Sequence, residues 1–137
     1  MLGVVRKLTP AVAAALVLFS PGVQAAGPSF LGTWVGTASQ VGRDGGYAVV
    51  LTIDAKSAQT SYPDEQCLGN LTRVGASGNY VFYSELIIKG RFNPTTGKGC
   101  VDGTITLARA PDKVLFGWFG MSDGAAVVAF ADLTQAR

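Results

Sequence analysis

The segment "SYPDEQCLGNL", residues 61–71, contains the residue types that could carry chemistry. Asp64 and Glu65 are the only adjacent acidic pair in the sequence, and Cys67 is one of 2 cysteines. Two carboxylates hydrolyse a glycoside when they flank the scissile bond. Neighbours in an extended chain point to opposite sides, however, and Pro and Asp favour turns whose side chains face water. The pattern therefore favours a solvent-facing turn over a hydrolytic pair.

The residue types that the sequence lacks limit the reactions it could catalyse. There is no histidine, which is the usual general base near neutral pH. There is also no Gly-x-Ser-x-Gly turn, phosphate-binding loop or dinucleotide-binding fingerprint. We therefore expect a protein that is not an enzyme and that has no cofactor.

Residues 1–26 have the three parts of a secretory signal peptide. Two basic residues precede an uncharged run over residues 8–19, and small residues follow up to Ala26. A transmembrane anchor requires roughly 20 apolar residues, which is more than the run between Pro10 and Pro21 supplies. We expect removal of this leader on export, no stable membrane anchor afterwards, and a periplasmic or extracellular location.

The exported part, residues 27–137, is formally neutral. Two of the 11 Lys and Arg lie in the leader and none of the 9 Asp and Glu do, so 9 charges of each sign remain. A neutral domain has no overall attraction for phosphate backbones, which argues against a nucleic-acid partner. Its length of about 110 residues suits one domain with one core.

Cys67 and Cys100 both belong to the exported part. In an oxidising compartment, two such cysteines are expected to form a disulfide. The competing interpretation is a metal site. A structural zinc site takes four ligands, and this sequence offers two distant thiols and no histidine. The disulfide is therefore favoured, and no metal is expected.

From Thr33 onward the sequence consists of short alternating runs separated by glycine and turn residues. This pattern predicts strands over residues 33–41, 47–54, 57–62, 68–74, 79–90, 101–109, 113–121 and 125–133. About eight antiparallel strands of this length indicate an all-β fold, a single small barrel or sandwich. Closure into a barrel removes exposed strand edges, and an eight-stranded barrel holds either packed side chains or one small ligand.

Five residues are candidates for ligand binding, with Glu85 the central one: Trp34, Tyr83, Glu85, Arg109 and Trp118. Glu85 shares one face of the strand over 79–90 with apolar side chains, and a buried charge requires a partner. Arg91 and Arg109 are the candidate ionic partners, and backbone amides are the other structural possibility. The functional alternative is a polar anchor in an apolar ligand cavity. The candidate walls of such a cavity are Trp34, Tyr47, Tyr83 and Trp118.

The opening "FLGTW", residues 30–34, resembles the Gly-x-Trp signature of lipocalin and avidin-like barrels. In those families the Trp packs across one end of the barrel, and an Arg from a late strand lies over the indole. The resemblance implies that Trp34 closes an end of the barrel, with Arg109 or Arg91 over it, and that the barrel binds a small ligand.

A broader pattern resembles a bacterial exported β module that occurs in secreted proteins and as the extracytoplasmic part of some membrane-bound serine/threonine kinases. Its elements are matched by Trp34 and Gly36, Tyr62-Pro63 with Cys67, Gly69 and Leu71, Glu85 with Gly90, and Cys100 with Gly103, Ile105 and Leu107. The segment "RFNPTTGKG", residues 91–99, is longer than that family's pattern. The resemblance implies an extracytoplasmic binding or sensing module with no known reaction.

A third pattern resembles periplasmic inhibitors of c-type lysozyme. Those proteins have a Ser-Gly-x-x-Tyr loop and a later Tyr followed by Lys-Gly, for which this sequence offers Ser77 and Tyr80, then Tyr83 and Lys89. The loop is one residue shorter here. The resemblance implies that Ser77, Tyr80 and Lys89 would contact the cleft of a lysozyme.

Together these features predict an exported, non-enzymatic binding or sensing module. Its partner would be a protein, a cell-envelope component or a small apolar ligand; the alternatives are an inhibitor of a cell-wall hydrolase and a calycin-like ligand carrier. The barrel interior discriminates among them. A cavity of several hundred Å³ favours a small ligand, whereas a filled barrel with a protruding loop at 75–80 favours a protein partner. An open cleft with two carboxylates would favour hydrolysis.

Overall fold

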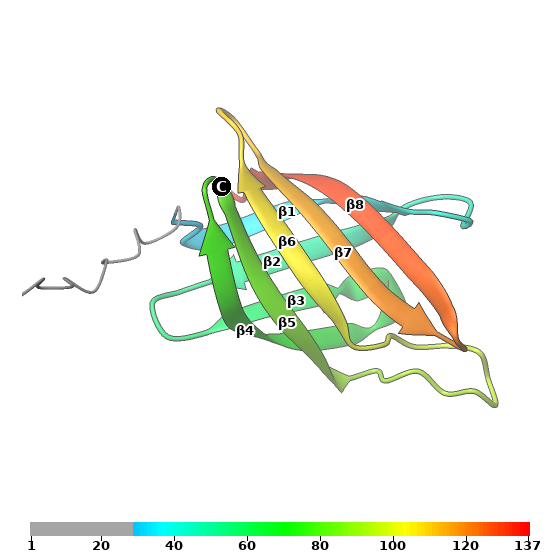
Figure 1. Ribbon diagram of the computed structural model, residues 1–137. Helices are drawn as coiled ribbons and strands as arrows, with labels where there is room; N and C mark the ends of the chain where they lie inside the picture. Colours follow the sequence, from blue (N-terminus) through cyan, green and yellow to red (C-terminus); the bar gives the residue numbers. More distant parts are fainter. Residues whose placement is uncertain (1–28) are drawn as a thin grey trace, which may run out of the picture.

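Eight antiparallel strands close into one barrel in the computed structural model, which describes residues 29–137 (Figure 1). They are β1 (Gly32–Gln40), β2 (Tyr47–Ile53), β3 (Ala58–Tyr62), β4 (Cys67–Ser77), β5 (Tyr80–Lys89), β6 (Gly103–Arg109), β7 (Val114–Ser122) and β8 (Ala125–Gln135). Each strand pairs with its neighbours in sequence, and β1 pairs with β8 to complete the circuit. The predicted all-β barrel is therefore confirmed. The predicted leader, residues 1–26, lies outside the described residues.

Five strands begin and end within one residue of their predicted bounds, whereas β4, β6 and β8 differ by two or more residues at one end. β8 continues to Gln135, which pairs with Trp34 of β1. β4 continues to Ser77 because a bulge between Arg73 and Gly75 lets it stay paired with β5. β6 begins only at Gly103, because Asp102 does not join the ladder. Its side chain accepts a hydrogen bond from the Ile87 backbone N–H at 2.8 Å instead.

The two ends of the barrel are built differently. At the end that we call the Trp34 end, Trp34 is 4% exposed and its Nε1 donates to the Phe30 carbonyl at 2.8 Å. The guanidinium of Arg109 lies 5.0 Å from the centre of the indole. The packing expected of Trp34 and Arg109 is thus present. At the other end, the cavity end, the connections 41–46, 63–66, 90–102 and 123–124 come together.

A long loop connects β5 to β6 at the cavity end. We call its residues 91–101 the mouth loop. Cys100 in this loop forms a disulfide with Cys67 at the start of β4. The Phe92 N–H donates to the Cys100 carbonyl, and the Cys100 N–H donates to the Gly90 carbonyl, each at 2.8 Å. The predicted disulfide is therefore confirmed, and it fastens the mouth loop to the barrel.

The outer surface of β5, β7 and β8 carries several large apolar side chains. Its large side chains that are half or more exposed are Tyr80, Leu86, Phe119, Met121 and Phe130. Within residues 29–137, no helix has the length and apolar character required to cross a membrane.

Reduction of the disulfide should destabilise the protein strongly. The bond closes a loop of about 34 residues, which corresponds to about 4 kcal/mol of unfolding free energy in the chain-entropy model. Thiol labelling of the unreduced protein in denaturant should find no free cysteine. Denaturant unfolding with and without reductant should show the loss. Two labelled thiols, or equal stability after reduction, would contradict the assignment.

Candidate functional site

A cavity of about 390 Å³ lies inside the cavity end of the barrel. The mouth loop, the turn before β2 and the inward side chains of several strands line it. Its aromatic walls are Tyr47, Tyr62, Phe92 and Trp118, and its charged lining residues are Arg43, Glu65, Glu85 and Lys98. Pockets for small molecules typically measure about 300–1,000 Å³. The interior is therefore hollow at this end.

Strand alternation places the polar groups at the inner end of this cavity. On β3, residues 58, 60 and 62 point inward, so Thr60 and Tyr62 share one face. On β5 the inward face includes Glu85, which lies four residues before the strand ends at Lys89 and is 2% exposed. Glu85 therefore forms the floor of the cavity.

Glu85 accepts hydrogen bonds from three side chains on two other strands. The Tyr62 hydroxyl donates to Oε1 at 2.8 Å, the Thr60 hydroxyl donates to the same oxygen, and Trp118 Nε1 donates to Oε2 at 2.6 Å. Trp118 is on β7, so the carboxylate links β3, β5 and β7 across the barrel.

The prediction that Glu85 pairs with an arginine or with backbone amides was wrong. Arg91 donates instead to the Ile87 carbonyl at 2.8 Å and pairs with Asp102 at 3.2 Å. Arg109 lies over Trp34 at the far end. The three donors to Glu85 are neutral side chains rather than a cation or backbone amides. Sequence reasoning sought a cation or backbone amides for the buried charge, whereas neutral side chains on β3 and β7 donate to it.

Burial is the main electrostatic influence at the floor. It raises the pKa of Glu85 above 4.5, against the lowering effect of the three hydrogen bonds, and nearby Asp102 adds to the rise. Burial and the negative charge of Glu85 also raise the pKa of Tyr62 well above 10.0. Tyr47, where burial again dominates, has a raised pKa as well. Both phenols are therefore protonated and neutral at physiological pH.

One ion pair lies at the rim of the cavity. Arg43 pairs with Glu65 at 2.6 Å, and its guanidinium lies 5.0 Å from the centre of the Tyr47 ring. Lys98, on the mouth loop, makes no ion pair with any residue in 29–137.

The adjacent acids Asp64 and Glu65 lie in different surroundings. Both residues belong to the short 3₁₀ turn η1 (Pro63–Glu65). Asp64 is exposed as expected, but it also accepts a hydrogen bond from the Ala48 N–H at 2.8 Å and so ties the turn to β2. Glu65 is half-buried at the rim, which corrects the expectation that it faces only water.

Three glycines provide the space that these groups occupy. A Cβ on Gly69 would lie 2.5 Å from Thr60 Oγ1 and 2.6 Å from Glu85 Oε1. A Cβ on Gly103 or on Gly120 would lie 2.4 or 2.3 Å from the Trp118 ring. The carboxylate and the indole therefore adopt their positions only because these sites lack side chains.

Four of the five predicted ligand-binding residues divide between the two ends of the barrel, and the fifth belongs to the core. Glu85 and Trp118 line the cavity, as does Tyr47 among the predicted walls. Trp34 and Arg109 lie at the Trp34 end, and Tyr83 is a buried core residue that does not line the cavity. The lining residues not proposed from the sequence include Arg43, Tyr62, Phe92 and Lys98. Alternation along β3 was a usable signal for Tyr62.

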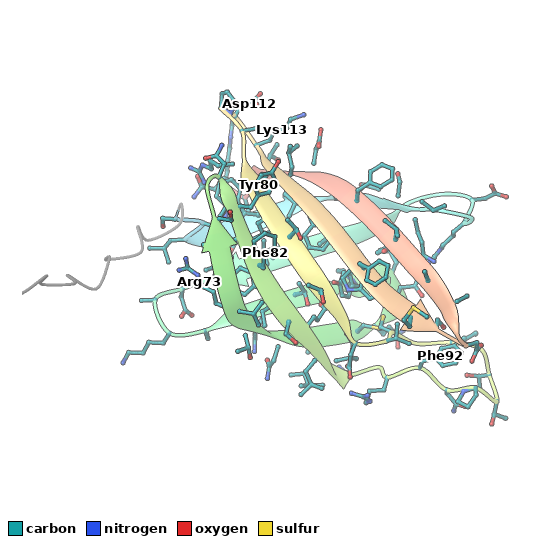
Figure 2. The ribbon with its side chains drawn as sticks, in the orientation of Figure 1. Arg73, Tyr80, Phe82, Phe92, Asp112 and Lys113 are labelled. Carbon is teal, nitrogen blue, oxygen red and sulfur yellow. A yellow bond between two sulfur atoms is a disulfide. The ribbon has the colours of Figure 1, made fainter. Side chains whose placement is uncertain are left out.

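The structure does not bring the three lysozyme-contact candidates together. Ser77 pairs with Tyr80 at the β4–β5 turn, whereas Lys89 is at the other end of β5, paired with Leu68. Nine residue steps of strand correspond to roughly 30 Å. Figure 2 shows Tyr80 near that turn and Phe92, on the mouth loop, toward the opposite end of the barrel. Residues 29–137 contain no cluster of three or more His, Cys, Asp or Glu suited to a metal.

A methyl group at residue 69 should disrupt the floor of the cavity. Gly69→Ala places a Cβ against the Thr60 hydroxyl and the Glu85 carboxylate, and overpacking of this kind costs about 1–3 kcal/mol of unfolding free energy. Gly75→Ala is the matched control on the same strand, because its Cβ meets nothing within 4 Å. Urea unfolding should show a large loss for the first variant and less than about 0.5 kcal/mol for the second. Equal losses would contradict this description of the floor.

Glu85 should make the protein less stable as the pH rises. Because burial raises its pKa in the folded state above 4.5, its contribution is complete below the unfolded pKa and is lost as pH rises through the folded pKa. The unfolding free energy of the wild type should therefore fall relative to that of Glu85→Gln over this range. The carboxyl carbon of Glu85 should titrate above 4.5 by NMR. A midpoint at or below 4.5, or a pH-independent difference between the two proteins, would refute this.

Comparison with protein-family models, with curated proteins and with solved structures finds no match to this chain. What the site can do therefore follows from its own geometry: an open cavity with aromatic walls, a buried carboxylate at its floor and a tethered loop at its mouth.

Proposed function

We propose that this protein is an exported, non-enzymatic module that binds one small molecule in the cavity end of its barrel. The observation that carries the proposal is the cavity of about 390 Å³ with four aromatic walls and a single buried carboxylate. Sites for small molecules are mostly apolar and contain a few placed polar groups. Among the candidate functions, this composition favours a ligand carrier or sensor of the calycin-like kind.

The disulfide supports the exported location. Such bonds persist in oxidising compartments and are rare where thiols are kept reduced. Cys67–Cys100 is consistent with such a compartment, and the signal-like leader agrees with it. We therefore propose that the protein is located in the periplasm or outside the cell.

The inhibitor alternative has less support from the geometry. It would require Ser77 and Lys89 to enter one cleft, and they lie at opposite ends of β5. The cavity of about 390 Å³ is at the end of the barrel away from the 77–80 turn.

Hydrolysis is the second candidate, because Glu65 and Glu85 line the same cavity. Both carboxylates are already engaged, however. Glu65 pairs with Arg43, and Glu85 accepts three hydrogen bonds from the protein. A catalytic pair must have one group free to protonate the leaving oxygen and another free to act on water or on the sugar. Binding is therefore the better-supported function.

The test is a search for ligands with the purified, disulfide-intact protein. A chemically diverse library of small molecules should contain compounds that raise the melting temperature by several degrees, since a ligand at 100 times its Kd adds about 2.7 kcal/mol of stability. Mass spectrometry of the recovered compounds should find them unchanged. Turnover without stoichiometric binding would favour hydrolysis and contradict the proposal.

Two variants of β8 locate the binding site. Val127 lines the cavity, and its neighbour Val128 is 40% exposed on the outer face. Val127→Phe should fill part of the cavity and weaken binding about tenfold or more, whereas Val128→Phe should leave binding unchanged. Near-UV circular dichroism of both variants checks that they are folded. Equal binding by both variants would place the ligand elsewhere and contradict the cavity as the site.

A further inference from the structure

We infer that the ligand carries an ammonium group, which lies against Glu85, on an apolar body that contacts the aromatic walls. This inference rests on the proposed function and specifies the class of ligand for the same cavity. It follows from the charge of the floor, its unused hydrogen-bonding capacity and the nature of the walls.

The first argument is charge balance. A buried carboxylate is normally paired with a cation. Within residues 29–137, the ion pairs involve Glu65, Asp102 and Asp132, and none involves Glu85. Glu85 is nevertheless 2% exposed. The floor of the cavity therefore has a negative charge without a counter-ion from the barrel, and a ligand cation would supply it.

The second argument is hydrogen-bonding capacity. An ionised carboxylate offers about four acceptor positions. Three are filled: two on Oε1 by Thr60 and Tyr62, and one on Oε2 by Trp118. Because the indole N–H can only donate, this arrangement suits the ionised acid. The remaining position is on Oε2, and Glu85 and Trp118 both line the cavity. It can accept one further donor from a ligand.

The third argument concerns the walls. Tyr47 and Tyr62 meet edge to face with ring centres 6.1 Å apart, and the Trp118 indole lines the same cavity. Aromatic faces attract cations, Trp most strongly, and the attraction is greatest where water is excluded. A floor with a carboxylate and aromatic walls therefore favours an ammonium over a neutral or anionic group.

The charges at the rim do not supply the missing cation. Arg43 is neutralised by Glu65 and lies over Tyr47. Lys98 lines the mouth on an exposed part of the loop. It would act on the opposite end of the ligand from Glu85, so an ammonium at the floor is compatible with it.

The inference can be tested with three probes that share a phenyl ring and a two-carbon chain: phenethylamine, 2-phenylethanol and 3-phenylpropanoate. They differ in carrying a positive, neutral or negative end group. At pH 7.5, calorimetry should show the amine binding about tenfold or more tightly than the alcohol, because hydrogen bonds to charged groups are substantially stronger. The carboxylate should bind most weakly.

The pH dependence provides a readout that needs no variant. As the pH falls through the folded pKa of Glu85, which burial raises above 4.5, protonation should remove the preference for the amine and leave the alcohol's affinity unchanged. The other ionisable groups that act on the floor are Tyr47 and Tyr62, which stay neutral, and Asp102, whose negative charge acts on Glu85 from outside the cavity lining. Glu65, Arg43 and Lys98 line the mouth.

Variants assign the preference to one carboxylate. Glu85→Gln should abolish the discrimination between amine and alcohol. Asp102→Asn, which removes a nearby carboxylate outside the cavity lining, should retain it. If Glu85→Gln does not fold, the pH series decides.

The possible failures are distinguishable. Equal or tighter binding of the alcohol or the acid, or a preference for the amine that survives protonation of Glu85, would overturn the ammonium assignment and leave the ligand-binding function standing. If no compound in the library binds in the cavity, both the ammonium assignment and the ligand-binding function are overturned.

Discussion

The architecture depends on one buried carboxylate. Glu85 lies in the barrel with almost no solvent exposure, and burying such a charge is costly unless its oxygens are hydrogen-bonded. Donors from β3 and β7 meet this requirement, so the three strands must keep their relative positions for the charge to be tolerated. The side chains of Thr60, Tyr62 and Trp118 point toward the carboxylate, and the cavity lies between it and the mouth loop. The same group therefore links three strands and forms the base of the cavity.

Glycines at three positions make this arrangement possible, because they have no side chain. Gly69 leaves room for the carboxylate, and Gly103 and Gly120 leave room for the indole that donates to it. The cavity end thus combines large side chains with positions that have none. The Trp34 end is closed differently, by the buried side chains of Phe30 and Trp34, with Arg109 over the indole. The cavity and the packed, closed face are consequently at opposite ends of the barrel.

Most of the fold was predictable, because alternation and turn residues are local signals. All eight strands and the disulfide were expected from the sequence. Arg109 over Trp34 is one of the two arrangements, Arg109 or Arg91, that the resemblance to lipocalin and avidin-like barrels implied. The site was predictable only in part. Glu85 stood out as a charge on an apolar face, but its donors come from strands far away in sequence, and register decides which residues meet. The lining of the mouth loop, with Phe92 and Lys98, lies in a segment without periodicity.

The pairing that closes the barrel also determines how the module can be attached to something else. β8 ends beside the start of β1, where Trp34 pairs with Gln135 and the Ala136 N–H donates to the Thr33 carbonyl at 2.8 Å. Residue 29 and the C-terminus therefore both lie at the Trp34 end (Figure 1). A reporter, tag or solid support joined to the C-terminus would stay behind the barrel, and the mouth would face solution. The domain is thus suited to immobilisation with its cavity accessible from solution.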